Sequence, residues 1–109
     1  MRLASRLEEI ILLAIWRLEG DAYGLAILEE IRKTTGKVWL TGSIYASLGR
    51  LLKHGLVESF EGDPVPERGG RRKIYYRVTP DGLQALKEVR KISSAIWTDI
   101  PLFEGKKDE

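Results

Sequence analysis

Two adjacent stretches decide the fold: residues 41–55 read TGSIYASLGRLLKHG, and residues 56–78 read LVESFEGDPVPERGGRRKIYYRV. The first stretch predicts a helix that begins at Thr41, a good N-cap, and ends at Gly55, which suits the position just after a helix. Its buried stripe is predicted from apolar residues at helical spacing, namely Ile44, Leu48, Leu51 and Leu52.

The opposite face of this predicted helix is polar and cationic. It carries Ser43, Ser47, Arg50, Lys53 and His54, with Ala46 and Gly49 beside them, and no acidic residue. Small polar residues come first along this face and cations come last. A recognition helix in the major groove of DNA needs this gradient, because its start meets base edges and its end passes phosphates.

The second stretch predicts a hairpin with a basic tip. Residues 56–61 and 73–78 alternate apolar and polar side chains, as antiparallel strands do. The Gly- and Pro-containing segment 62–72 predicts a flexible turn between them. From residue 68 to residue 78 there are five basic side chains and no acidic one: Arg68, Arg71, Arg72, Lys73 and Arg77.

Positive charge is concentrated in the middle of the chain. Residues 37–78 carry eight basic and four acidic side chains, or +4, whereas the whole chain carries +2. Residues 1–36 and 79–109 each have five basic and six acidic side chains, or −1. Such clustering favours a polyanionic partner, although a solvated basic loop would have the same charge.

Two helices are predicted before residue 41. In the first, Ser5 and Glu8 fit a capping box. Its apolar stripe is Leu3, Leu7, Ile10, Ile11, Ala14, Ile15 and Leu18, while Leu12, Leu13 and Trp16 lie on other faces and indicate a partner surface. The second helix covers residues 23–33, with Leu25, Ile27, Leu28 and Ile31 inward and Glu29, Glu30, Arg32 and Lys33 in water. Residues 37–40 then form a connector in which Trp39 or Leu40 fills the core.

The last predicted helix begins at Thr79, an N-cap followed by Pro80 at the first helical position. Its apolar residues are spaced like a coiled-coil seam: Leu83, Leu86, Val89, Ile92 or Ser93, Ile96 and Ile100. Pro101 is expected to stop it. The predicted fold class is therefore α+β, mostly α. We expect a winged helix-turn-helix over residues 1–78, a C-terminal dimerisation helix over residues 79–101 and a flexible tail over residues 102–109.

Several stretches are distinctive in combination. They are Tyr23–Gly24, residues 40–51, residues 53–57, residues 69–79 and Gly82. Over residues 7–100 the chain resembles the PadR-like transcriptional regulators, in particular the short members with one C-terminal helix. The resemblance implies a homodimeric regulator of transcription that binds double-stranded DNA and is usually a repressor. In the family the C-terminal helix and the first helix form the dimer.

The residues expected to bind DNA are Tyr23, Ser43, Tyr45, Ser47, Arg50, Lys53, His54, Arg71, Arg72 and Lys73, with Arg68 and Arg77 second. Ser47 is the candidate for a base edge, Ser43 for a phosphate, and Arg50 for a phosphate or guanine. Gly49 allows either a close approach of DNA or tight packing against the second helix. Tyr45 and Tyr23 suit either a phosphate contact or the core. Tyr75 and Tyr76 point to opposite sides of a strand, so one is expected in the core.

The expected dimer interface consists of Leu12, Trp16, Leu86, Val89, Ile92, Ile96, Trp97 and Ile100. Several short members of the family bind flat aromatic compounds between tryptophans in the dimer pore. The corresponding candidates here are Trp16, Trp97 and Ser93, although Trp97 lies about one turn later than that tryptophan. Trp97 is therefore either interface packing or a platform for a small aromatic effector that releases the repressor from a pseudo-palindromic operator.

Other classes of protein are disfavoured. Without cysteine and with the single histidine His54, the chain lacks the ligands of the common zinc sites and a catalytic thiol. No residue pair has the spacing of a nucleophile and base, so we expect no enzyme, no cofactor and no metal. No apolar run reaches the length of a membrane span, and a cytoplasmic protein is expected. The alternative function is a winged-helix protein-interaction module that does not bind DNA.

Overall fold

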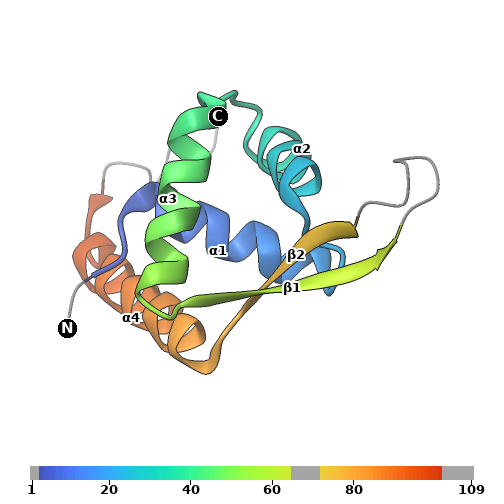
Figure 1. Cartoon of the computed structure of the whole chain (residues 1–109). Coiled ribbons are helices and arrows are strands. Elements are labelled where there is room, and N and C mark those ends of the chain that lie inside the picture. The colour runs from blue at the N-terminus through green and yellow to red at the C-terminus, as the bar shows by residue number, and fades with distance from the viewer. Residues whose placement is uncertain (1–2, 65–71, 102–109) are drawn as a thin grey trace.

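The computed structural model describes residues 3–64 and 72–101 (Figure 1). Within these ranges the elements are α1 (Arg6–Leu18), α2 (Gly24–Thr35), α3 (Thr41–Lys53), β1 (Val57–Pro64), β2 (Arg72–Val78) and α4 (Pro80–Trp97). This is the predicted order of a winged helix-turn-helix followed by one C-terminal helix. The predicted flexible tip, with Arg68 and Arg71, lies largely outside the described residues, as does the tail over residues 102–109.

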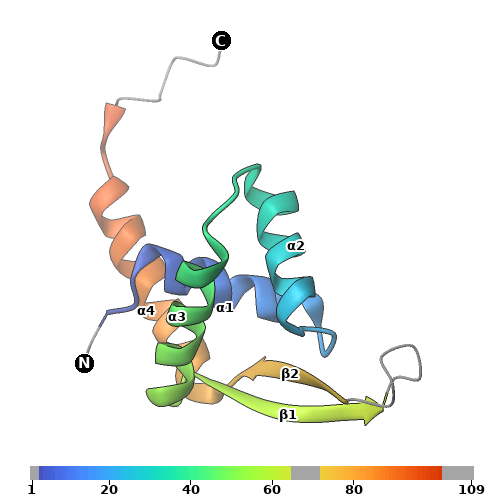
Figure 2. The ribbon, with the colours of Figure 1, turned by 45° about the horizontal axis from the view of Figure 1, so that its top comes forward.

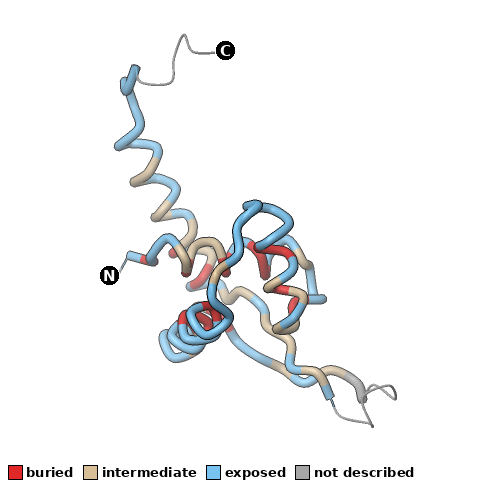
Figure 3. Tube along the Cα trace, turned by 90° about the horizontal axis from the view of Figure 1, so that it is seen from above, coloured by how far each residue is buried: buried red, intermediate tan, exposed pale blue. Residues whose placement is uncertain are grey.

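Helix α1 lies at the centre of the fold, in contact with α2, α3, β2 and α4 (Figure 1). The core is built from apolar side chains of α1, α2 and α3 with Val57 of β1, and the buried parts of the chain converge there (Figure 3). Leu12 is completely buried in this core, so the prediction that it lies on a free face and forms a dimer interface is wrong. Because α2, α3, β2 and α4 contact α1 on several sides, more of its circumference is buried than the predicted apolar stripe covers.

The two strands form an antiparallel sheet that pairs Val57 with Val78 and Phe60 with Tyr75. A third segment joins this sheet: the Tyr76 amide donates to the Ala22 carbonyl at 2.8 Å, and Tyr23 forms a bridge with Tyr75. This pairing was not predicted, because two residues before a helix are too short to show strand periodicity. It fixes the start of α2 against the wing.

The helices differ in how their N-termini are capped. In α1 the predicted capping box is present, and in α4 the Thr79 hydroxyl accepts a hydrogen bond from the Gly82 amide at 3.0 Å. In contrast, neither Tyr23, the N-cap of α2, nor Leu40, the N-cap of α3, supplies a side-chain cap. Thr41 was predicted as the N-cap of α3 and is instead its first helical residue.

The connector before α3 has one inward and two outward apolar side chains. Trp39 packs against the core, which decides between the two predicted candidates. Val38 and Leu40 are 82% and 79% exposed. Leu25 of α2 was predicted to face inward and is 62% exposed, because the first turn of α2 lies beyond the core, toward the wing.

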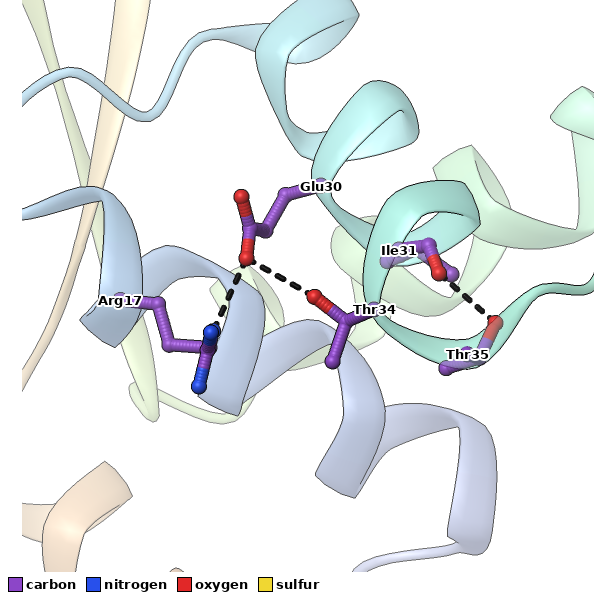
Figure 4. A network of polar contacts seen from close by, with 5 residues as sticks. All are labelled: Arg17, Glu30, Ile31, Thr34 and Thr35. Atoms are coloured by element: carbon purple, nitrogen blue, oxygen red, sulfur yellow. Dashed lines mark hydrogen bonds and ion pairs between the residues drawn. The ribbon is translucent and has the colours of Figure 1, made fainter.

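A polar network joins α1 to α2 (Figure 4). Glu30 accepts hydrogen bonds from Arg17 Nε and from the Thr34 hydroxyl, both at 2.9 Å. The Arg17 guanidinium, followed by Thr34, holds the pKa of the Glu30 carboxyl below its ordinary value. Glu30 was predicted in water and is buried, because α1 lies against this side of α2.

The two halves of α4 have different surroundings. Near its start Gly82 and Ala85 are buried, and Leu86, which was expected at a dimer interface, packs against the core of the same chain. The C-terminal half extends away from the rest of the molecule (Figure 2). The helix ends at Trp97, four residues before Pro101, with Ile100 beyond it.

Candidate nucleic-acid interface

The exposed face of α3 is lined by small residues followed by a cation. Gly42, Ala46, Gly49 and Lys53 are all exposed. A Cβ atom added at Gly42 or Gly49 would meet nothing within 4 Å beyond its chain neighbours and the nearby backbone of the same helix. Of the two interpretations of Gly49, packing against α2 is therefore wrong. The open glycines let another surface approach the backbone of α3 closely.

Ser47 does not lie on this face. It is 1% exposed, and its hydroxyl accepts a hydrogen bond from Arg50 Nη2 at 2.8 Å. The prediction that Ser47 is available to a base edge is wrong, because the start of α1 covers this side of α3. Glu8 of α1 reaches across it, with Oε2 at 3.6 Å from Arg50 Nε. Arg50 itself remains 53% exposed, as predicted for its face.

Beside α3 lies a groove between the start of α2 and the wing, which we call the α2–wing groove. Its lining residues are Tyr23, Gly24, Leu25, Tyr45, Arg72, Lys73, Ile74 and Tyr76, and its volume is about 350 Å³. It collects four of the predicted DNA-binding residues, Tyr23, Tyr45, Arg72 and Lys73, from three different elements. The sequence had offered no spacing that relates them.

Aromatic rings shape the walls of the groove. The Tyr23 ring packs edge-on against Tyr75, with ring centres 5.7 Å apart, and Lys73 Nζ lies 4.0 Å from the centre of the Tyr23 ring. Tyr45 lies so close to Gly24 that a Cβ atom there would collide with its hydroxyl. Gly24 thus lets the Tyr45 ring of α3 lie directly against the start of α2, and a larger residue there would displace the ring. The sequence signalled it only through the Tyr23–Gly24 motif.

The groove favours anions. At the start of α2 no side chain caps the helix and the first turn contains no acidic residue, so its amide groups and its dipole present positive charge. Lys73 and Arg72 add two cations from β2. Arg72 Nη1 lies 3.8 Å from a Glu61 carboxylate oxygen, which is a loose pair between exposed side chains. Tyr45 also lines the groove, and its hydroxyl is a donor of the kind that phosphate oxygens accept.

Other expected wing residues are engaged differently. Arg77 donates to Glu58 at 2.6 Å and stacks over the Phe60 ring at 4.5 Å, and it lines a different pocket, nearer the base of the wing, instead of the groove. Tyr76 packs against the core, and its burial raises the pKa of its phenol. Tyr75 stacks on Phe60 instead. Of the two tyrosines, the core residue is therefore Tyr76.

The residues expected at the dimer interface are not all on one surface. Trp16, Ile96, Trp97 and Ile100 are exposed, as is Leu13, which was predicted with Trp16 to face a partner. Leu3 was predicted on the core-facing stripe of the first helix and is exposed instead, because it precedes the first turn of α1. Val89, Ile92 and Ser93 are partly exposed. Trp16 lines a pocket with Phe60 and Tyr76 near the C-terminal end of α1, whereas the C-terminal half of α4, which ends at Trp97, extends away from the rest of the molecule (Figure 2). Within a single chain Trp16 and Trp97 are therefore not brought together.

Residues 3–64 and 72–101 contain neither a membrane-spanning helix nor a cluster of metal ligands. None of the helices in these ranges combines the length and the apolar content that crossing a membrane requires. In the same ranges, no three His, Cys, Asp or Glu side chains gather as metal ligands would.

Known proteins share both the sequence and the fold. The profile of the transcriptional regulator PadR-like family matches residues 11–88. A transcriptional regulator from Clostridium thermocellum is 30% identical, with a TM-score of 0.71 over 90% of this chain and 89% of that one. A PadR-like transcriptional regulator from Bacillus cereus is 29% identical, with a TM-score of 0.73 over 92% and 93%. No curated protein matches significantly.

The winged-helix architecture is also that of a more distant protein. A PadR family transcription regulator from Clostridium difficile, 24% identical, has a TM-score of 0.73 over 93% of this chain and 100% of that one. At that identity the likeness concerns the fold. The family profile, in contrast, spans more than half of the sequence, from within α1 into α4. By this match the chain belongs to the PadR-like family of transcriptional regulators.

Proposed function

We propose that this regulator binds double-stranded DNA in a sequence-specific way, as a homodimer on a pseudo-palindromic operator, and represses transcription. The observation that carries the proposal is the α2–wing groove, which places Lys73, Arg72 and the uncapped start of α2 beside the open face of α3. Cations and free amides suit a phosphate, and an open helix face suits the major groove.

In this proposal the two surfaces have different tasks. Helix α3 enters the major groove, where Gly42, Ala46 and Gly49 allow its backbone to approach the bases. Arg50 is the candidate for a base edge, while Lys53 and His54 pass phosphates at the end of the helix. The α2–wing groove receives a phosphate of the flanking backbone. Ser43, exposed in the first turn of α3, contacts another phosphate together with the uncapped amides.

The dimer would form through exposed apolar side chains of α1 and α4. Ile96, Trp97 and Ile100 are 67%, 52% and 39% exposed, and Leu13 of α1 is 43% exposed. Large apolar side chains gathered at the surface favour a protein partner. Two-fold symmetry would present two α3 helices about one turn of DNA apart, roughly 34 Å. An effector between tryptophans would have to use residues of both protomers, and it stays a prediction.

The direct test is fluorescence anisotropy with labelled duplexes, first of random sequence and then of sequences selected for tight binding. We expect binding to both, with a steep dependence on salt concentration, and preference for a selected site with two related halves. Light scattering should give the mass of a dimer. Failure to bind any duplex at micromolar protein and low salt would contradict DNA binding and favour the interaction module.

A further inference from the structure

Glu8 is a buried carboxylate that serves two elements. Its side chain is 1% exposed. Oε1 accepts a hydrogen bond from the Ser5 amide at 2.8 Å, which closes the capping box of α1. Oε2 lies 3.6 Å from Nε of Arg50, on the recognition helix α3. One side chain therefore links the start of α1 to the predicted DNA-facing surface.

The capping box alone does not account for the charge on Glu8. The amide oxygen of glutamine can accept the same hydrogen bond from the residue 5 amide. Burial of a carboxylate is costly unless a cation accompanies it. Arg50 is a cation within reach of this carboxylate, at 3.6 Å.

Arg50 is held from two directions. Nε faces the Glu8 carboxylate, and Nη2 donates to the Ser47 hydroxyl at 2.8 Å. Both Glu8 and Ser47 are buried, so these anchors have fixed positions. The guanidinium nevertheless remains half exposed, and its other N–H groups are available outside. An arginine fixed before binding loses less rotamer freedom when it meets a base.

We propose that Glu8 is a positioning residue for DNA recognition: with Ser47, it orients the Arg50 guanidinium toward a base edge. This inference rests on the proposed function, because it assigns a specificity role within the same interface. Ser47 thus acts beneath the interface and does not read a base itself. Glu8 contributes to the preference among sequences more than to attraction for DNA in general.

The test is a double-mutant cycle with wild type, Glu8→Gln, Arg50→Ala and the double variant. Affinities are measured by anisotropy for a duplex selected with the wild type and for a random duplex. Arg50→Ala should lower the ratio of selected to random affinity roughly 5- to 150-fold, the range for one bidentate base contact. Glu8→Gln should lower it roughly 2- to 10-fold, as coupled neighbours do. In the Arg50→Ala background Glu8→Gln should have no further effect.

Glu9→Gln is the matched control, because Glu9 lies in the same turn of α1 and pairs with Arg6 instead. It should leave the ratio unchanged. An equal loss of specificity from Glu8→Gln with and without Arg50 would overturn the inference, since Glu8 would then act through the fold alone. An unchanged ratio in Glu8→Gln would overturn it too. Thermal unfolding of each variant confirms that folded proteins are compared.

A measurement without DNA separates this inference from the proposed function. The heteronuclear NOE of the Arg50 Nε–H group reports how strongly the side chain is ordered. It should be high in the wild type and in Glu9→Gln, and clearly lower in Glu8→Gln. If the wild type bound no duplex, the proposed function would fail while this measurement would still decide whether Glu8 orders Arg50. A mobile Arg50 in the wild type would overturn the positioning role.

Discussion

Helices α1 and α4 supply their own N-terminal caps, whereas α2 and α3 do not. Ser5 and Glu8 form the capping box of α1, and Thr79 caps α4 with Asp81 in its first turn. The N-caps of α2 and α3 are Tyr23 and Leu40, whose side chains accept no amide hydrogen bond, and neither first turn contains an acid. The capped pair contributes the exposed apolar side chains of the proposed dimer interface, and the uncapped pair lines the proposed DNA surface.

This difference has a physical explanation. A side-chain cap contributes about 1 kcal/mol to stability, so a helix without one gives up stability. The uncapped amides and the helix dipole then remain available to a phosphate. An acid in the first turn would stabilise the helix but repel DNA. We infer that the two helices of the proposed DNA surface lack caps so that their free amides can bind an anion, while caps in the other two helices stabilise the fold.

The largest expected effect comes from removing the cations that lie beside an uncapped helix. Arg72→Ala combined with Lys73→Ala should weaken binding to every duplex roughly 10- to 100-fold, because two phosphate contacts are lost. The slope of log affinity against log salt should fall by up to about two units. Anisotropy at several salt concentrations measures both.

Arg77→Ala is the matched control for the wing. Arg77 is on the same strand but pairs with Glu58 and stacks on Phe60, away from the groove. It should leave the salt slope nearly unchanged. If the double variant at Arg72 and Lys73 had the same salt slope as the wild type, the α2–wing groove would not be part of the DNA interface.

The next largest effect concerns a capped helix. Thr79→Ala removes the cap bond to the Gly82 amide and the hydrogen bond that its hydroxyl donates to the Gly55 carbonyl at 2.6 Å. The free energy of unfolding in urea should fall by about 1–2 kcal/mol. DNA affinity of the folded protein should not change. Thr79→Ser retains both groups and should be nearly neutral, and an affinity loss in folded Thr79→Ala would break the distinction between the two pairs of helices.

A cap can also be added where the structure has none. Leu40→Ser should stabilise the fold by about 0.5–1 kcal/mol, because the hydroxyl can accept from a free amide of α3. The same substitution should weaken DNA binding a few-fold, because the new cap competes with phosphate. The free energy of unfolding in urea should therefore rise while the DNA affinity measured by anisotropy falls. Leu40→Ala is the control, because it removes the exposed side chain without adding a cap, and it should not stabilise the fold. Tighter DNA binding by Leu40→Ser would contradict the idea that free amides at this helix start bind phosphate.

The smallest effect is a dependence of stability on pH. Because the pKa of Glu30 is lowered in the folded protein, its contribution is fully present above the ordinary glutamate pKa of about 4.3 and is lost as the pH falls through the lowered value. Since Arg17 is largely exposed, the contribution is below about 1 kcal/mol. Urea unfolding near neutral and acidic pH should show less acid destabilisation in Glu30→Gln. Glu29→Gln, which removes an exposed pair, should retain the wild-type pH dependence.

Apolar periodicity predicted the helices and strands well, but it did not predict every buried face of the helices. Leu12 and Ser47 both lie next to predicted stripes, and both are buried because a neighbouring helix covers a wider arc than the stripe. Conversely, Leu25 is apolar and helical but lies beyond the core. Spacing along one helix indicates which residues share a side. It does not indicate how many sides other elements cover.

The sequence by itself determined the order of elements, the capped starts of α1 and α4, the basic wing and the family, because these depend on local propensity and on motifs. Only the tertiary structure decided which residues meet. It joined Tyr45 to Gly24, brought Lys73 over Tyr23 and placed Glu8 against Arg50. Such contacts depend on the angles and distances at which elements pack. No pattern within a single element contains that information, because side chains far apart in the chain become neighbours only through folding.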